Sequence, residues 1–214
     1  MSWNVRGLNA PNKRRLIKSQ LDLMKCDVLL LQETKLSCQG ADFLFSKWKL
    51  WNFCVSPSVE ASGGLAFLWN DVSTEFKLVV STPLWMWALS SLHGKTVVFG
   101  GDFNAISSDD EKIGGILPNK RILGDFSAFI HNNDLVDCKT LNGLFTWTNR
   151  RKDLSQIAER LDHFLVSAAW ISSDMDVVAS VLPYAGSDHF PIVLSILDDR
   201  APGRSSFKFE PMWF

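Results

Sequence analysis

Five short polar motifs occur along the chain, and most of them directly follow an apolar run that is typical of a β-strand. They are Ser2-Trp3-Asn4, Gln32-Glu33-Thr34, Gly101-Asp102-Phe103-Asn104, Arg160-Leu161-Asp162 and Ser187-Asp188-His189. Carboxylates and amides at strand ends can meet at one edge of a pair of sheets, and such oxygen ligands suit Mg²⁺ or Mn²⁺. A histidine among them can act as a general acid or base. Together the motifs predict a divalent-metal site with a histidine beside it.

Each motif also has an ordinary structural interpretation. Asn4 can bond a neighbouring backbone group, and Glu33 can be a simple polar strand end. The motif at 101–104 can be a turn, because Asp and Asn favour turns. Asp162 can form a surface ion pair, which contributes little to stability, and His189 can be a packed, hydrogen-bonded residue. All of these interpretations would have to hold together and in this order, so the combined pattern favours a functional site.

Short apolar runs alternate with two amphipathic stretches, and this pattern predicts the elements that position the motifs. Helices are expected over 13–24 and 120–132, where apolar residues recur at helical spacing. Strands are expected over 2–5, 27–32, 53–56, 65–69, 76–80, 96–99, 145–148, 161–166, 177–182 and 192–197. Many strands with few helices predict an α/β (α+β) fold. Its expected form is a four-layer sandwich of two packed mixed β-sheets flanked by helices.

Composition narrows the class of protein further. The 214 residues fit one domain, and 46% of them are hydrophobic, which is enough for a full core. The formal net charge of −1 gives no global signal for nucleic acid, so any such contact requires local basic patches. The four scattered cysteines indicate reduced, intracellular thiols. No apolar run approaches the roughly 18 residues needed to cross a bilayer, and we expect a monomer without a membrane partner.

In their order along the chain, the motifs resemble the endonuclease/exonuclease/phosphatase superfamily. The finer resemblance is to the apurinic-endonuclease-like endonuclease domain of plant non-LTR (LINE-type) retrotransposons. The matching segments are SWNVRGLN (2–9), LLLQETK (29–35), SGGLAFLW (62–69), GDFNAI (101–106), FTWTN (145–149), ERLDHFLVS (159–167) and SDHFPI (187–192).

The resemblance also implies a domain organisation. Residues 1–197 would form the nuclease domain, and 198–214 would be a linker-like tail towards a reverse transcriptase domain in the parent element. Within this tail FKFEPMWF, at 207–214, resembles the segment that connects nuclease and reverse transcriptase in plant elements. A nuclear location is expected from the resemblance alone.

Metal ligands are implied residue by residue. Glu33 would be the principal ligand, with Asn4 beside it and Asp188 close to the ion. The expected cofactor is Mg²⁺, with Mn²⁺ as an alternative. The expected reaction is phosphodiester hydrolysis by in-line attack of water, with the metal offsetting negative charge on the phosphate.

Catalytic roles are implied in the same way. Asp102 would orient or deprotonate the attacking water, and Asn104 would hold the scissile phosphate. His189 would donate a hydrogen bond to a phosphate oxygen, and Asp162 would fix the orientation of His189. Lys13, Arg150, Arg151 and Lys152 are the residues expected to contact DNA, through its phosphates rather than its bases.

The chain departs from the family pattern between residues 70 and 101. This region is shorter than in intact members, which carry a phosphate-binding tyrosine and arginine there. The segment over 83–89 resembles the end of a family helix, so we expect one strand and helix region to be deleted, leaving a gap in one sheet. Tyr184, the sole tyrosine, lies elsewhere. Arg6 stands where many repair relatives place an aspartate near the metal.

Three functions remain open at this point. The first is a DNA endonuclease that nicks one strand, impaired by the loss of the tyrosine-bearing segment. The second is a catalytically dead remnant of such a nuclease. A phosphatase or sphingomyelinase-like enzyme of the same fold is the third, and Ala105-Ile106 after the GDFN motif does not resemble those groups.

Overall fold

The computed structural model describes residues 1–48, 51–59, 62–70, 76–81, 86–90, 96–117, 119–171 and 175–198. The helices in this part are α1 (Pro11–Met24), α2 (Cys38–Phe45), the 3-10 turn η1 (Asp109–Glu111), α3 (Lys120–Asn132) and α4 (Ala168–Ile171). The strands are β1 (Ser2–Asn4), β2 (Val28–Gln32), β3 (Asn52–Val59), β4 (Ser62–Trp69), β5 (Phe76–Ser81), β6 (Met86–Ser90), β7 (Thr96–Asp102), β8 (Lys112–Ile113), β9 (Leu135–Asp137), β10 (Trp147–Thr148), β11 (Ala158–Glu159), β12 (Asp162–Ser167), β13 (Met175–Val181) and β14 (Ile192–Asp198).

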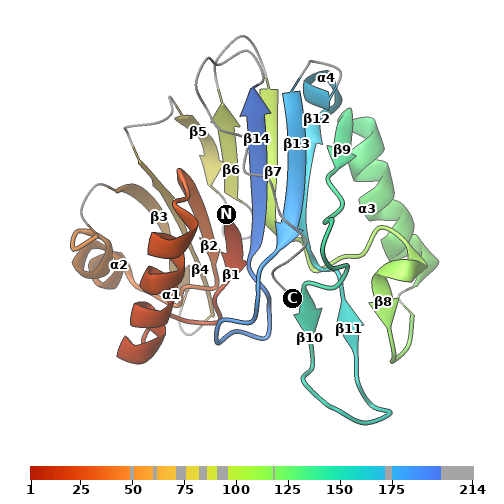
Figure 1. The fold of residues 1–214 in the computed structure, drawn as a ribbon, viewed down its shortest axis with the longest axis horizontal. Helices are drawn as coiled ribbons and strands as arrows, with labels where there is room; N and C mark the ends of the chain where they lie inside the picture. Colours follow the sequence, from red (N-terminus) through yellow and green to blue (C-terminus); the bar gives the residue numbers. More distant parts are fainter. Residues whose placement is uncertain are drawn as a thin grey trace, which may run out of the picture.

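Two large sheets form the centre of the fold. The first has the order β13-β14-β1-β2-β4-β3 and is mixed, because β1 pairs parallel with β2 and antiparallel with β14. The second has the order β5-β6-β7-β12-β9 and pairs antiparallel. Helices α1 and α2 lie outside the first sheet and α3 lies outside the second (Figure 1). The four-layer α/β sandwich expected from the sequence is therefore the observed fold.

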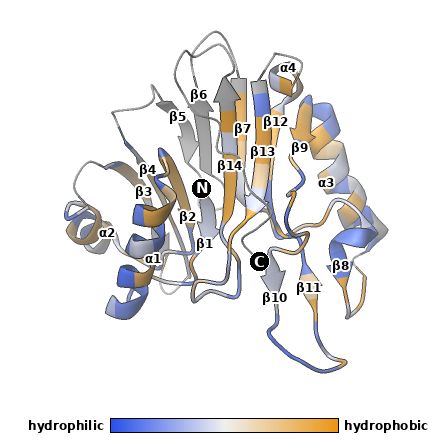
Figure 2. Ribbon diagram, in the orientation of Figure 1, coloured by the Kyte–Doolittle hydropathy of each residue, from blue (hydrophilic) through white to orange (hydrophobic). Residues whose placement is uncertain are grey.

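The core follows from the alternation of side chains along each strand. Leu29 and Leu31 on β2 pack with the residues of α1, whereas Leu30 between them points to the second sheet. A Cβ atom on Gly100 would lie 2.5 Å from Phe164 and 2.8 Å from Leu30, so glycine at this position lets the two sheets approach closely. Figure 2 shows hydrophobic residues concentrated on these central strands and hydrophilic residues on the outer side of α1.

The two long helices have local reasons for where they begin. In α1, Pro11 occupies the first turn, where its missing N–H needs no partner. In α3, the side chain of Asn119 caps the helix by accepting a hydrogen bond from the backbone N–H of Arg121 at 3.0 Å. Phe126 of α3 then packs against Phe103, at a ring-centroid distance of 5.4 Å. This contact places α3 behind the loop that leaves β7.

Two expectations about the second sheet are corrected by the structure. Residues 83–89 resemble the end of a family helix and were expected to be helical, but Met86–Ser90 forms strand β6. The expected gap is also wrong for the described strands, because Ala88 of β6 pairs with Leu78 of β5 on one side and Val98 of β7 on the other. Residues 82–85 and 91–95 lie outside the described residues.

Other sequence expectations were incomplete. Helix α2 and the small third sheet, β10-β11-β8, were not predicted. The tail over 199–214, including the aromatic segment at 207–214, lies outside the described residues. Among the residues that the structure describes, no helix has the length and apolar character to cross a bilayer.

Candidate active site

The predicted motifs meet at one end of the two packed sheets. Strands β1 and β2 run parallel, so Asn4 at the end of one lies beside Gln32 at the end of the other. In the second sheet, Asp102 at the end of β7 is paired directly with Asp162 at the start of β12. The loop from β13 to β14 carries Asp188 and His189 to the same end, towards the bottom of Figure 1. Segments that are far apart in the sequence, from Asn4 to His189, thus form one site.

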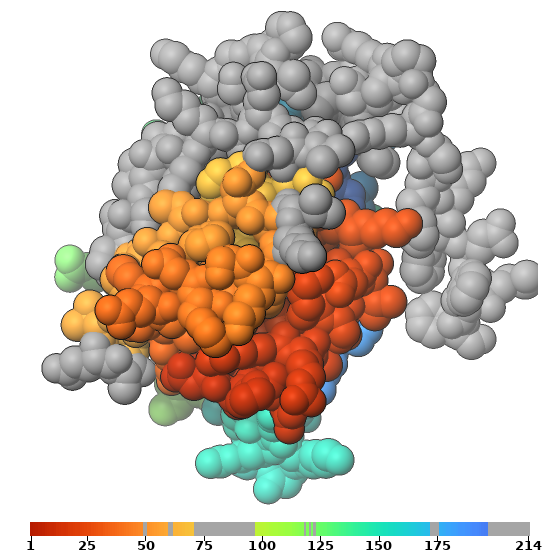
Figure 3. All heavy atoms as spheres, turned by 90° about the vertical axis from the view of Figure 1, so that its left-hand side faces the viewer, coloured from red at the N-terminus to blue at the C-terminus, as the bar shows by residue number. Residues whose placement is uncertain are grey.

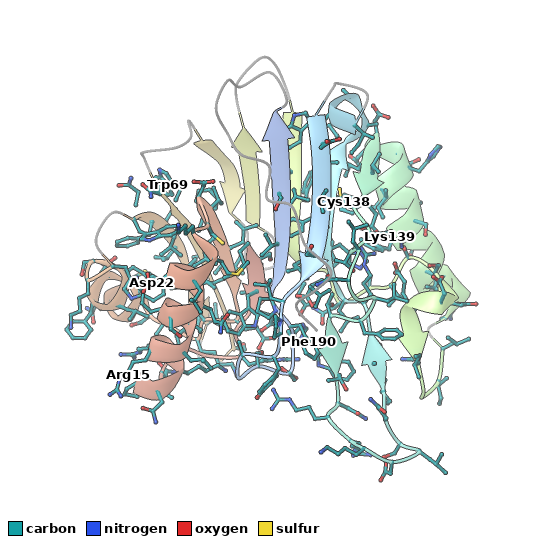
Figure 4. All side chains as sticks on the ribbon, in the orientation of Figure 1. Arg15, Asp22, Trp69, Cys138, Lys139 and Phe190 are labelled. Carbon is teal, nitrogen blue, oxygen red and sulfur yellow. The ribbon has the colours of Figure 1, made fainter. Side chains whose placement is uncertain are left out.

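His189 lies at the centre of this site and is fully buried. Its Nδ1 donates a hydrogen bond to Asp162 Oδ2 at 2.9 Å. That carboxylate oxygen also accepts a hydrogen bond from the Thr146 hydroxyl at 2.7 Å. The Asp162 contact assigns the Nδ1 proton, which leaves Nε2 of His189 as the nitrogen 3.6 Å from Asp102 Oδ2. The neighbouring Phe190 marks this region in Figure 4.

The pKa values of His189 and Asp102 are both raised above their ordinary values. Burial alone would lower the pKa of His189, but the Asp162 hydrogen bond and the nearby carboxylate charges together raise it above its ordinary value. Burial, followed by the charge of Asp162, raises the pKa of Asp102 to about 6. A carboxylate with a pKa near neutrality can accept and release a proton, which is the requirement for a general base.

Asp102 is held by two hydrogen bonds. The Asn4 side-chain amide donates to Asp102 Oδ2 at 2.9 Å, and the backbone N–H of Asn104 donates to Oδ1 at 2.9 Å. Asn104 itself has a φ of 48°, and its side chain is exposed beside the carboxylate. The structure therefore places Asn4, Asp102 and Asn104 together, as the sequence motifs required.

Glu33 and Asp188 share a cation, and that cation is Arg6. Its Nη1 lies 2.9 Å from Glu33 Oε1, and its Nε lies 3.2 Å from Asp188 Oδ1. Trp147 fixes the other oxygen of Asp188, because its indole N–H donates to Oδ2 at 3.1 Å. Two carboxylates within reach of one positive group have the chemistry of a divalent-metal site. These residues fit a metal, and in this arrangement the Arg6 guanidinium stands between them.

A second cluster with metal-ligand residue types has a structural role. Glu111, Asp137 and His163 bring ligand atoms within 4.8 Å of one another. Fully buried Arg160 joins two of them: Nη1 lies 2.7 Å from Glu111 Oε1, and the guanidinium binds both oxygens of Asp137 at 2.6 Å. Lys139, labelled in Figure 4, adds a contact to Glu111. Because arginine and lysine neutralise these carboxylates, the cluster is an ion-pair network linking η1, β9 and β12.

A hollow of about 620 Å³ opens beside the site. It is lined by Arg6, Thr148, Asn149, Arg150, Gly186, Ser187 and Asp188. Burial lowers the pKa of Lys13, and the positive charges of Arg150, Lys35 and Arg6 lower it further, so these four cations lie near one another. Arg151 and Lys152 are exposed on the β10–β11 loop but do not line the hollow. Figure 3 shows this loop, in teal, projecting from the body of the molecule.

Backbone conformation sets the site apart from the rest of the described chain. Among the described residues, seven that are not glycine have a positive φ. Five of these lie at the site or around the hollow: Arg6, Glu33, Lys35, Asn104 and Arg150. Such conformations cost on the order of 1–3 kcal/mol each and concentrate at functional sites. The clustering supports a functional role for this end of the sheets.

Several residues of the site were missed or undervalued from the sequence. Arg6 was noted only as a departure from the family pattern, and Trp147 was included only as part of the FTWTN segment although it hydrogen-bonds Asp188. Thr146 had no assigned role, yet its hydroxyl contacts Asp162. The FTWTN motif at 145–149 was the available signal for the last two. Tyr184 lies under Arg150, with 4.6 Å between the guanidinium carbon and the ring centroid.

Comparison with solved structures places this geometry among known folds. An AP endonuclease from Leishmania major has a TM-score of 0.71 at 16% identity, covering 89% of this chain and 85% of its own. A 3′ phosphatase from Neisseria, bound to a product DNA hairpin, has a TM-score of 0.68 at 18% identity, covering 91% and 97%. The endonuclease domain of TRAS1, a telomere-specific non-LTR retrotransposon, has a TM-score of 0.65 at 14% identity, covering 93% and 98%. At these identities the likeness establishes the fold.

Sequence comparison gives the family. No curated protein matches the chain. The profile of the Endonuclease/Exonuclease/phosphatase family matches residues 1–189, which is most of the chain. The chain therefore belongs to the endonuclease/exonuclease/phosphatase family, whose members are hydrolytic nucleases and phosphatases.

Proposed function

We propose that this protein is a divalent-metal-dependent DNA endonuclease of retrotransposon type that nicks one strand. The observation that carries this proposal is the convergence of Asp102, His189 and Asp162 at one end of both sheets, beside the carboxylates of Glu33 and Asp188. Hydrolysis of a phosphodiester requires an acid, a base and a metal site close together, and this group of residues can supply all three.

The residues divide the chemical work between them. Asp102, with its raised pKa, accepts a proton from the attacking water. His189, protonated on both ring nitrogens, donates a hydrogen bond from Nε2 to a phosphate oxygen, and Asp162 orients the ring and stabilises its positive charge through Nδ1. Asn104 binds the same phosphate from the exposed turn after β7. The water oxygen bonds to phosphorus as the bond to the leaving oxygen breaks.

Glu33 and Asp188, with Asn4 beside them, are the residues that would hold the metal. When bound there, Mg²⁺ or Mn²⁺ would supply positive charge that offsets the charge developing on the phosphate. Hard oxygen ligands favour Mg²⁺ among the abundant cellular ions. The Trp147 hydrogen bond keeps one oxygen of Asp188 pointing away, which leaves the other for a cation.

DNA is the proposed substrate because positive groups surround the hollow beside the site. Arg6 and Arg150 line it, and Lys13 contacts the Arg6 carbonyl at 3.3 Å. Arg151 and Lys152 extend the basic surface along the projecting loop. Such contacts bind phosphates without reading bases. The likeness to a non-LTR retrotransposon endonuclease supports the finer assignment.

The sequence motifs add context to this proposal. Motif resemblance supports a plant LINE-type element, in which residues 198–214 would lead to a reverse transcriptase. A nuclear site of action follows from the same resemblance, since the DNA of the host genome would be the target.

A catalytically dead remnant is the second candidate, and one observation favours it. Arg6 binds both carboxylates that a metal would need. Nicking of supercoiled plasmid with Mg²⁺, compared with Glu33→Ala and His189→Ala, separates the two candidates. Nicking that disappears in both variants supports the nuclease. Absence of nicking by wild-type protein that circular dichroism shows to be folded overturns it.

A further inference from the structure

We propose that Arg6 and the divalent metal compete for Glu33 and Asp188, so that the Arg6 side chain acts as a built-in inhibitor of metal binding. The inference rests on the proposed function only in taking these two carboxylates as metal ligands. It concerns how tightly the site binds its ion, and it can hold whether or not the protein cuts DNA.

The contacts of one guanidinium carry the argument. Arg6 Nη1 lies 2.9 Å from Glu33 Oε1, and Nε lies 3.2 Å from Asp188 Oδ1. A third nitrogen, Nη2, lies 3.4 Å from Nε2 of His189. The guanidinium therefore fills the space between the two carboxylates and reaches the catalytic histidine. A metal bound by both carboxylates would have to occupy the same space.

Electrostatics makes the two occupants exclusive. Like charges repel, so a guanidinium and a divalent cation cannot share a pair of carboxylates at contact distance. In this structure the Arg6 guanidinium contacts both carboxylates and offsets their mutual repulsion. The free carboxylates are thus stabilised by an internal cation that incoming metal must displace.

Backbone hydrogen bonds fix the position of Arg6, whereas its side chain can rotate away from the two carboxylates. The Arg6 N–H donates to Asn4 Oδ1 at 3.1 Å, and the N–H of Gly7 donates to the Glu33 carbonyl at 2.7 Å. These bonds tie the turn after β1 to the residue that binds metal. The Arg6 side chain is 40% exposed, so release requires rotation of a solvated side chain and no refolding.

Exposure also limits the strength of the inhibition. Each exposed ion pair changes an equilibrium constant by a factor of roughly five or less. Removal of both ion pairs should therefore lower the Kd for the metal about 10-fold. Arg6→Met keeps an unbranched side chain that reaches about as far as the arginine Nε, and it removes the charge. Arg150→Met is the matched control, because Arg150 lines the same hollow but stacks on Tyr184.

The test is calorimetric titration of the full chain with Mn²⁺, which needs no nuclease activity. We expect Arg6→Met to lower the Kd about 10-fold. Arg150→Met should change the Kd by about 2-fold or less, because salt screens a charge that does not contact the carboxylates. Adding Glu33→Gln to Arg6→Met should abolish the tightened binding. Arg6→Gln serves as a second variant if Arg6→Met is shown by circular dichroism to be unfolded.

The inference would be overturned by equal Kd values for wild type and Arg6→Met, by equal effects of the Arg6 and Arg150 variants, or by tight binding that survives Glu33→Gln. No Mn²⁺ binding by any variant would overturn it as well. Tightened binding in a protein that never nicks DNA would leave the inference standing and remove the proposed function. Nicking of DNA by a protein whose Mn²⁺ affinity does not increase in Arg6→Met would overturn the inference and leave the proposed function standing.

Discussion

The Asp162 carboxylate accepts a hydrogen bond from His189 Nδ1 at 2.9 Å, and both side chains are buried. Replacement of the carboxylate by an amide should therefore disturb the imidazole more than the fold. We expect Asp162→Asn to lower kcat for plasmid nicking by roughly 100-fold or more with little change in KM, because the protonated histidine loses its charge partner and its fixed orientation. The pKa of His189, followed by NMR, should fall in the same variant.

Thr146→Val is the control for this change, because it removes the other donor to the same oxygen. Its effect on kcat should be the smaller one, since it leaves the carboxylate and the histidine contact in place. An Asp162→Asn enzyme with unchanged kcat would contradict the positioning role.

The shifted proton affinities predict a bell-shaped dependence of nicking rate on pH. Asp102 must be deprotonated to accept a proton, so the rate should rise as the pH increases through about 6. His189 must be protonated at Nε2 to donate to phosphate, so the rate should fall once the pH exceeds its raised pKa. His189→Gln should lower the rate and remove the alkaline fall. A rate independent of pH across the acid limb would refute the assignment of Asp102.

The buried network around Arg160 predicts a large loss of stability. Arg160→Met leaves Glu111 and Asp137 without their principal partner, and uncompensated buried charge of this kind costs about 3–5 kcal/mol. Urea unfolding followed by circular dichroism measures the change. Lys18→Met is the matched control, because its ion pair with Asp22 is exposed and should contribute about 0.5 kcal/mol or less. Similar losses in both variants would show that the network does not stabilise the fold.

The same network predicts how stability responds to acid. Burial alone would raise the pKa of Asp137, but hydrogen bonds from Arg160 and His163 lower it well below its ordinary 3.8. Because folding lowers this pKa, the stabilisation is complete above the unfolded value and is lost as the pH falls below it. The free energy of unfolding should decline as the pH falls below about 4. In Asp137→Asn this decline should be shallower, and an identical decline would contradict the role of Asp137.

The basic surface predicts a particular effect on DNA binding. Arg150→Met and Arg151→Met together should weaken binding to all DNA sequences alike, because phosphate contacts carry no base information. The slope of log K against log salt should decrease by about 0.9 for each phosphate that the variant no longer neutralises. Titration of labelled duplexes at several salt concentrations measures both quantities. Weakened binding to one sequence only would indicate base contacts instead.

Local signals explain which elements the sequence could predict. The helix over 120–132 matched the structure because its apolar spacing begins after a capping residue, Asn119. Strand β6 was not predicted because residues 83–89 were interpreted from their resemblance to the end of a family helix, and the apolar run over 86–89 lacks the alternation of a strand. Its conformation is supported by pairing with β5 and β7, its neighbours in the chain, and single-residue propensity does not contain that pairing information.

The candidate site could be predicted for the residues that belong to ordered motifs. Asp102, Asp162 and His189 were identified from residue type and from the order of the motifs along the chain, and the structure brings them into contact. Arg6 could not be placed in the same way. Its position depends on a turn with a φ of 47° and on a loop 182 residues later, and both emerge only from the assembled sheets.

Contacts between distant parts of the chain also govern how this site can form. The Trp3 indole N–H donates to the His189 carbonyl across 186 positions, and the Ser187 hydroxyl donates to the Asn4 carbonyl across 183. Closing such long loops is entropically expensive, so these contacts should be among the last to form. At about 5–20 residues per second, the ribosome delivers His189 roughly 10–40 s after Trp3. Once β2 has been synthesised, β1 has β2 as a neighbour but lacks β14 for the rest of that interval, so the nascent chain keeps an open sheet edge where a chaperone could bind.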